Sequence, residues 1–440
     1  MLGGTALALL LASAPARPAG DGRLVFGTKS EEAAAAAREA MQVFVRTGDL
    51  AAVEALAQQA VDADRTFAFA RCLLALGFSA SSREASDVQW AQARELAPSA
   101  PEGERQWVAA FLLRDNRQDA GVRNEAIAAW KKIADNYPQE PLAFSMLAGA
   151  YSRRWLMDSR NGADDDAWHE AAETVLSLDD KSATAHRGLA EYSMRRNDFS
   201  HARDHLAWAR EALGPDAPLD CGVAGMMEVR AHLFDGAPAE AQVLARRCRE
   251  RFMTADGVPA ATWNFIGRVL LETGDAEGGL AAYEKGLGWI ERLTWTEDEQ
   301  ALRQVWIGRY HHGRGRCLAK LGKHAEAWAE VETVKKMLDG GGDAGKRYLP
   351  AYHYLAGYVK LEAGDTRAAL DHLEQAAAAG DGFRTLLLAR AHDKLGQTDE
   401  ARRRYREILE SKDLDVERAL AYAEAKTRLA ALDAAAATRR

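Results

Sequence analysis

Apolar residues return at helical spacing along most of the chain. Strictly alternating apolar and polar runs, bounded by hairpin turns, are absent, so the pattern does not favour strands. The clearest unit is residues 263–275, with the sequence WNFIGRVLLETGD, which continues into residues 279–286, GLAAYEKG. This is an apolar helix, a Gly-Asp turn and a second helix, and it predicts an all-α fold of antiparallel helix pairs.

Small residues recur at two places of this unit, where they would let two helices approach closely. The eighth place holds Ala190, Gly267, Gly315, Gly357 and Ala389, and the twentieth holds Ala126, Ala202, Ala241, Gly279, Ala327, Ala369 and Ala401. Glycines are expected to end the first helix in a left-handed conformation at positions 48, 236, 274, 322, 364 and 396. Asp49, Asp198, Asp275 and Asp365 are placed to cap the second helix.

This pattern resembles the tetratricopeptide repeat (TPR) family, whose unit has 34 residues. The resemblance implies a right-handed superhelical solenoid of antiparallel helix pairs, with about ten hairpins over residues 28–410. The repeats are degenerate in residues 31–140 and clear in residues 183–410, and residues 416–432 are expected to form a C-terminal capping helix. The closest likeness is to exported bacterial proteins built entirely of such repeats.

The repeats change what the length and charge mean. A chain of 440 residues first suggests about three domains, but a repeat array predicts one solenoid that is stabilised hairpin by hairpin. The 57 Lys and Arg against 65 Asp and Glu give a net charge of −8, which predicts no nucleic-acid partner.

The first 20 residues have features of a secretory signal peptide. Residues 6–12 are an uninterrupted apolar run, and Ala14, Pro15 and Ala16 fit a cleavage site, although no Lys or Arg precedes the run. The sequence therefore predicts a periplasmic or secreted protein, or a cytoplasmic one if this segment is not a signal. No other stretch approaches 18 apolar residues, so no membrane span is expected.

Four cysteines are too few for a disulfide scaffold. Cys221 and Cys248 fall at the two ends of one predicted hairpin and could pair in an oxidising compartment. Small buried thiols that replace alanine are the alternative interpretation.

Several fragments imitate catalytic motifs without completing them. Residues 340–347 have phosphate-loop spacing, but Arg347 stands where Ser or Thr should bind magnesium, so a flexible loop between repeats is expected. His169 and Glu170 begin a zinc-protease motif that ends in Glu173 instead of histidine, and His201 with His205 is expected to be a solvated pair. The sequence predicts no enzyme activity, no cofactor and no metal site.

Binding is predicted instead on the first helices, which in the TPR family line the concave surface. The resemblance assigns to this groove Arg187, Arg230, Asn264, Arg268, Arg309, His312, Arg316, Tyr354, Tyr358 and Arg390. Such a locally basic groove suits an acidic peptide or a C-terminal carboxylate. The alternative is that these arginines are solvated or paired with acidic residues of neighbouring helices. Of the tryptophans, Trp263 is expected in the core, whereas a stacking role for Trp295 stays open.

The resulting prediction is a non-enzymatic scaffold or adaptor that binds protein or peptide partners in its concave groove. The alternative is a ligand-sensing module that acts on a separate regulatory partner.

Overall fold

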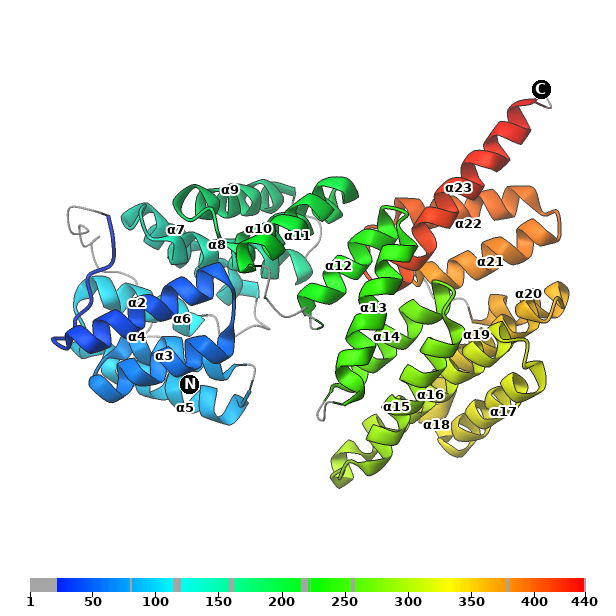
Figure 1. Ribbon diagram of the computed structural model, residues 1–440, viewed down its shortest axis with the longest axis horizontal. Helices are drawn as coiled ribbons and strands as arrows, with labels where there is room; N and C mark the ends of the chain where they lie inside the picture. Colours follow the sequence, from blue (N-terminus) through cyan, green and yellow to red (C-terminus); the bar gives the residue numbers. More distant parts are fainter. Residues whose placement is uncertain are drawn as a thin grey trace. The chain divides into compact units, whose positions relative to one another are not determined.

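A computed structural model of the protein describes residues 22–79, 81–113, 120–157, 162–214, 221, 223–254, 258–376 and 380–438. Within these ranges the chain is helical and contains no strand. In these ranges the helices form ten successive pairs, with the short helix α18 between the eighth and ninth pairs and α23 after the tenth (Figure 1). The predicted all-α solenoid of antiparallel helix pairs is confirmed. The predicted signal segment, residues 1–20, lies outside the described residues.

The pairs divide into two compact units. Unit 1 comprises described residues up to Arg196 together with residues 204–214. Its helices are α2 (Glu31–Arg46), α3 (Leu50–Ala63), α4 (Ala68–Phe78), α5 (Arg83–Leu96), the 3-10 turn Ala97–Ser99, α6 (Glu102–Leu113), α7 (Ala120–Asn136), α8 (Pro141–Met157), α9 (Gly162–Leu178) and α10 (Ala183–Arg195). Helix α11 (Phe199–Leu213) contributes its first turn to unit 2 and its remainder to unit 1.

Unit 2 comprises residues 197–203 and the described residues from Cys221 onward. Its helices are α12 (Val223–Phe234), α13 (Pro238–Met253), α14 (Ala260–Glu272), α15 (Ala276–Arg292), the 3-10 turn Glu297–Glu299, α16 (Gln300–Lys320), α17 (His324–Gly340), α18 (Gly342–Arg347), α19 (Leu349–Glu362), α20 (Thr366–Gln375), α21 (Gly382–Lys394), α22 (Thr398–Glu410) and α23 (Val416–Thr438).

The turns within the pairs have the predicted chemistry. All six glycines named above have a positive φ, from +69° at Gly48 to +100° at Gly274, where a side chain would be strained. The Asp275 side chain accepts a hydrogen bond from the Gly278 amide at 2.8 Å and so caps α15. Asp49 and Asp365 cap α3 and α20 in the same way. One short turn thus directs each second helix back along the first.

Small residues also lie where the helices of a pair cross. A Cβ atom built on Gly279 of α15 would lie 2.9 Å from the carbonyl oxygen of Gly267 on α14. The two backbones can be this close because Gly279 lacks a side chain, and a Cβ atom on Gly267 would lie 2.9 Å from the Tyr283 ring. The interpretation of the eighth and twentieth positions is therefore confirmed for this pair.

Each unit has its own apolar core. In unit 1, the indole rings of Trp107 and Trp130 are fully buried with centroids 5.6 Å apart, and Phe111 packs against Trp130. In unit 2, Leu355 and Phe383 belong to a cluster that includes residues of α23. Trp263 is also buried, as predicted for a core residue.

Two predicted boundaries need correction. Residues 342–347 form helix α18, whereas a flexible loop was expected over residues 340–347; Gly341 lies between α17 and α18, and Gly342, which begins α18, has a φ of +57°. The C-terminal helix continues to Thr438 rather than ending at residue 432, because the run Ala434–Ala437 has high helix propensity.

Cys221 and Cys248 form a disulfide with a Cα–Cα distance of 5.4 Å, which joins the segment before α12 to α13. Cys72 and Cys317 are buried free thiols. Between the two alternatives that the sequence left open, the structure favours the pair.

Within the described residues, none of the helices combines the length and the apolar composition that a bilayer crossing requires.

Candidate functional site

The predicted groove residues lie on first helices of their pairs, but they belong to different units. Arg187, on α10, is part of unit 1, where its guanidinium donates to the Thr47 carbonyl at 3.1 Å. The other nine residues lie in unit 2, on α12, α14, α16, α19 and α21. The candidate site is therefore described for unit 2.

Arg316 of α16 is the centre of the site. Its side chain is only 3% exposed, and its guanidinium lies 3.3 Å from the Glu272 carboxylate of α14. It also donates to the Tyr283 hydroxyl at 3.1 Å and lies over the rings of Tyr354 and Tyr358. A buried guanidinium needs such partners because desolvation of an unpaired charge is costly.

Arg268 of α14 extends this network. It donates to the Tyr354 hydroxyl at 3.3 Å and forms an ion pair with Glu417 of α23 at 2.5 Å. The hydroxyl of Tyr358 donates to Glu272 at 3.2 Å. Burial raises the pKa of Tyr354 and Tyr358, so both phenols remain protonated at neutral pH. Two arginines are thus held by phenol and carboxylate groups of four helices.

His312 lies beside this network as a neutral ring. Burial lowers its pKa well below the usual range, and the nearby guanidinium groups of Arg316, Arg384 and Arg268 lower it further. Its ring centroid lies 4.7 Å from that of Tyr354. In the part of the chain that the structure describes, His312 Nε2 is buried without a hydrogen-bond partner.

The remaining predicted residues have varied surroundings. Arg390 of α21 makes a two-pronged ion pair with Glu424 of α23, at 2.7 and 2.5 Å. Arg230 donates to the Leu414 carbonyl at 2.7 Å. Arg309 is exposed and stacks over Trp306 at 4.8 Å, and Asn264 is half-buried. The structure brings together Arg268, His312, Arg316, Tyr354 and Tyr358, with Arg390 joined to them through α23.

Helix α23 covers the end of the array. It also covers part of the surface formed by the first helices α12, α14 and α21, which is the inner face of unit 2. It contacts α12, α14, α21 and α22, and Ala421 and Ala425 are fully buried. Two of its carboxylates, Glu417 and Glu424, are seven residues apart and therefore lie on one face, two turns from each other. The sequence contains this spacing, but no local pattern in it indicates that these acids meet Arg268 and Arg390.

A cavity of about 370 Å³ remains beside α23. It is lined by Lys320, Leu361, Glu362, Arg390, Asp393, Lys394, Tyr405, Glu424 and Arg428. Three ion pairs occupy its wall: Lys320 with Glu362, Arg390 with Glu424, and Arg428 with Asp393. In the described part of the chain, Lys394 has no ion-pair partner, so this cavity has one uncompensated positive charge.

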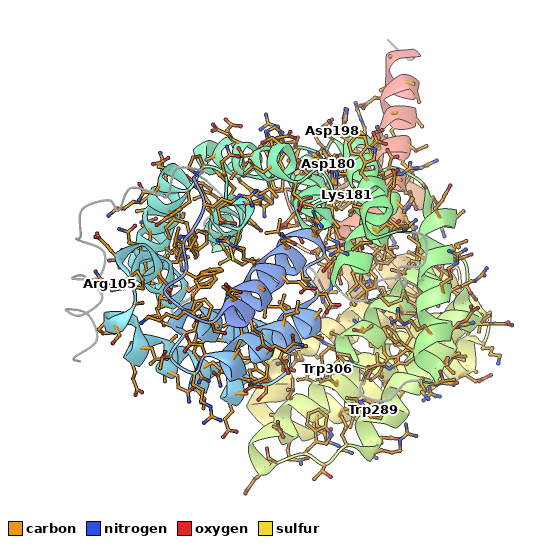
Figure 2. The ribbon with its side chains drawn as sticks, turned by 60° about the vertical axis from the view of Figure 1, so that its left-hand side comes forward. Arg105, Asp180, Lys181, Asp198, Trp289 and Trp306 are labelled. Carbon is orange, nitrogen blue, oxygen red and sulfur yellow. A yellow bond between two sulfur atoms is a disulfide. The ribbon has the colours of Figure 1, made fainter. Side chains whose placement is uncertain are left out.

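The tryptophans and histidines that the sequence singled out do not line this cavity. Trp289 of α15 and Trp306 of α16 are half-buried side chains of neighbouring helices (Figure 2). The Trp295 indole donates to the Ile290 carbonyl at 3.0 Å, which fixes this ring against its own hairpin. His201 pairs with Asp198, and the Nδ1 atom of His205 lies 3.3 Å from that of His186 on α10. Among the described residues, no group of three or more His, Cys, Asp or Glu side chains is arranged to hold a metal ion.

Comparison with known proteins gives matches only among solved structures. No protein-family model and no curated protein matches the chain. The similar structures include a tetratricopeptide repeat protein from Parabacteroides merdae, with 13% identity, 63% of this chain and 99% of that chain covered and a TM-score of 0.36. The human IFIT1 dimer with PPP-AAAA is 14% identical, with 98% of this chain and 91% of that chain covered and a TM-score of 0.40. Yeast Tom70 is 11% identical, with 84% of this chain and 90% of that chain covered and a TM-score of 0.32.

These similarities are distant, so the assignment of the fold rests on the chain's own helices and turns. The prediction that nucleic acids are not partners rests on net charge alone and stays a prediction. The antiparallel helix pairs, the left-handed glycines in their turns and the small residues at their crossings give the chain the all-α helix-pair fold that the resemblance to tetratricopeptide repeats implies.

Proposed function

We propose that the protein is a non-enzymatic scaffold or adaptor that binds an acidic segment of a protein partner at the inner face of unit 2. The observation that carries this proposal is the way in which α23 is held. Arg268 and Arg390 each bind a carboxylate of that helix, so the face already accommodates acidic helical sequence. Guanidinium groups in this arrangement favour carboxylates over other partners.

The cavity beside α23 is the accessible part of this face. Lys394 is exposed there, and Lys320 is already paired with Glu362 at 2.7 Å. An incoming carboxylate would therefore find one free ammonium group next to the Arg390–Glu424 pair. Arg268 and Arg316 are buried, so they are not themselves the contact points of a partner.

Affinity capture with chemical crosslinking tests the proposal on the full chain. The variants are Lys394→Glu at the cavity and Lys336→Glu as the matched control, an exposed lysine on the second helix α17. We expect a partner whose acidic segment crosslinks to α21 or α23 and whose affinity falls about fivefold in Lys394→Glu, since reversal of one exposed charge is worth about 1 kcal/mol. Equal capture by wild type and both variants would contradict the proposal.

We also propose that the protein acts after export. The apolar N-terminal segment is followed by a small-residue cleavage site, and the Cys221–Cys248 disulfide is of the kind that persists in oxidising compartments. Alkylation of the protein in its native fraction, followed by mass spectrometry, measures both features. The expected result is a chain that begins after the A-x-A site, with Cys221 and Cys248 protected until reduction. An uncleaved chain with two reactive thiols would indicate a cytoplasmic protein.

A further inference from the structure

Two pairs of histidines face each other across the helices of their hairpins. His353 of α19 and His372 of α20 have their Nδ1 atoms 3.0 Å apart. His186 of α10 and His205 of α11, both in unit 1, have theirs 3.3 Å apart. In each pair the two residues are separated by 19 positions, so both pairs occupy the same places of the repeat.

The separation of the nitrogen atoms matches that of two ligands on one metal ion. Imidazole nitrogens bind Zn²⁺ at about 2.0–2.1 Å, and with an angle of about 90–110° at the metal they lie about 2.8–3.4 Å from each other. Both observed distances fall within this interval. In the metal-free protein the same distance accommodates a hydrogen bond from one Nδ1–H to the other Nδ1, which holds the two rings in place.

The surroundings of His186, His353 and His372 lower their pKa values and so favour the neutral ring, and a metal ion binds neutral imidazole. Burial lowers the pKa of His353, with smaller contributions from His372 and Lys335, and burial together with Lys360 lowers the pKa of His372. These lysines have carboxylate partners, because Lys335 pairs with Asp339 and Lys360 with Asp365. Burial also lowers the pKa of His186, while the Glu173 carboxylate opposes this shift.

In a third hairpin, a glutamate replaces the second histidine of the pair. His311 of α16 and Glu330 of α17 are also 19 positions apart, with Nδ1 and the carboxylate oxygen separated by 2.7 Å. There the carboxylate pairs with the ring and with Arg314, at 3.3 Å. Of these three described hairpins, the two with His–His pairs present two imidazole nitrogens, whereas the third presents one.

We propose that His353 and His372 bind one divalent transition-metal ion between α19 and α20, and that His186 and His205 form a second site of the same kind. All four rings are half-buried, so water can occupy the other coordination positions. Imidazole ligands suit Zn²⁺, Ni²⁺ and Cu²⁺, and Cu²⁺ should bind more tightly than Zn²⁺. The ion would join the two helices of each hairpin.

Equilibrium dialysis of the full chain, purified without a histidine tag, against Cu²⁺ and Zn²⁺ tests the proposal. The wild type should bind two ions per chain, His353→Gln or His372→Gln one, and the combination of His372→Gln with His186→Gln none. Each single substitution should weaken its site by more than about tenfold, because loss of even an outer-shell partner of a ligand costs that much. The exposed His324 supplies the control, since His324→Gln should retain both ions.

Electron paramagnetic resonance of the Cu²⁺-loaded chain gives a second readout, in which each site shows hyperfine coupling to two imidazole nitrogens. Circular dichroism of each variant verifies its helical content. A pair whose ion survives substitution of both of its histidines is not a site, and wild-type protein that binds no ion overturns the proposal entirely.

Discussion

Burial decides what the charged residues of the inner face do. Arg268 and Arg316 are arginines at the positions expected to line a groove, yet their side chains are 9% and 3% exposed. Each partner lies on a different helix from its arginine: Arg268 of α14 meets Tyr354 of α19 and Glu417 of α23, and Arg316 of α16 meets Glu272 of α14. A residue's place in the repeat therefore predicts which way it points, and its neighbours decide whether it is available to a ligand.

Replacement of Arg316 by leucine should lower the free energy of unfolding by about 3–5 kcal/mol. The reason is that Glu272, whose side chain is 4% exposed, would remain buried without its ionic partner. Urea denaturation followed by circular dichroism measures the change. Arg403→Leu is the control, because the Arg403–Glu400 pair is largely exposed and should contribute less than about 1 kcal/mol. Similar losses in both variants would show that the buried network does not stabilise the fold.

Asp415, the residue before α23, should make the stability of unit 2 depend on pH. Burial raises the pKa of its carboxyl from 3.8 to about 6, although the Arg418 amide hydrogen bond opposes the shift. Between these values the folded state binds a proton that the unfolded state has released, so stability falls as pH rises from about 4 to about 6.

Asp415→Asn should remove this dependence, because asparagine keeps the hydrogen-bond acceptor and carries no charge. We expect the variant to match wild type near pH 4 and to exceed it by about 1–2 kcal/mol above pH 7, after allowance for solvent screening. Urea denaturation at a series of pH values measures this difference. A constant difference across the range would assign the effect to something other than titration of Asp415.

At the scale of the helices, the crossing points set how closely two elements pack. The α14–α15 pair approaches at Gly267 and Gly279, while the same α15 carries Gly288, around which no atom lies within 4 Å of a built Cβ. Gly279 and Gly288 are equally unfavourable for a helix in isolation. Their different surroundings make them a matched pair for measurement.

Gly279→Ala should destabilise the protein by about 1–3 kcal/mol, because its methyl group would force the two backbones apart. Gly288→Ala should instead stabilise it by about 0.5–1 kcal/mol, since alanine has the higher helix propensity and meets no neighbour. Thermal unfolding followed by calorimetry compares the two. A gain in stability from Gly279→Ala would mean that the helices can separate there at little cost.

At the scale of the molecule, terminal segments complete each unit. In unit 1 the Leu24 amide donates to Glu140 at 3.2 Å, and Ser182 donates to the Val45 carbonyl at 2.7 Å, so the first pair contacts the last helices. In unit 2 the buried Arg418 of α23 donates to the Ile408 and Asp413 carbonyls and to Asn197 at the start of α11. Each unit is therefore joined from its first helix to its last.

Arg418→Ala should loosen unit 2 as a whole. The loss of these charged hydrogen bonds should cost about 3 kcal/mol and raise amide exchange throughout residues 221–438, with residues 22–196 unchanged. Hydrogen-exchange mass spectrometry makes the comparison, with Arg428→Ala as a control on the exposed side of the same helix. Faster exchange in both units would show that they do not behave as separate cooperative bodies.

The sequence by itself determined the helix pairs, their turns and their crossing points. These features depend on residues close in the chain: a left-handed glycine at 274, the cap at Asp275 and the small residue at Gly279 each act within one hairpin. Their physical effects are local, so the pattern of residue types is sufficient to predict them.

Only the tertiary structure decided the division into two units, the burial of Arg268 and Arg316, the position of α23 and the two histidine pairs. Glu417 meets Arg268 across 149 positions of sequence, and the partners of such a contact depend on how far each hairpin is rotated against the next. Small rotations accumulate along a solenoid, and no local pattern encodes their sum. The sequence therefore shows which side chains are charged. Tertiary packing decides which of them are desolvated, and so which of them can bind a ligand.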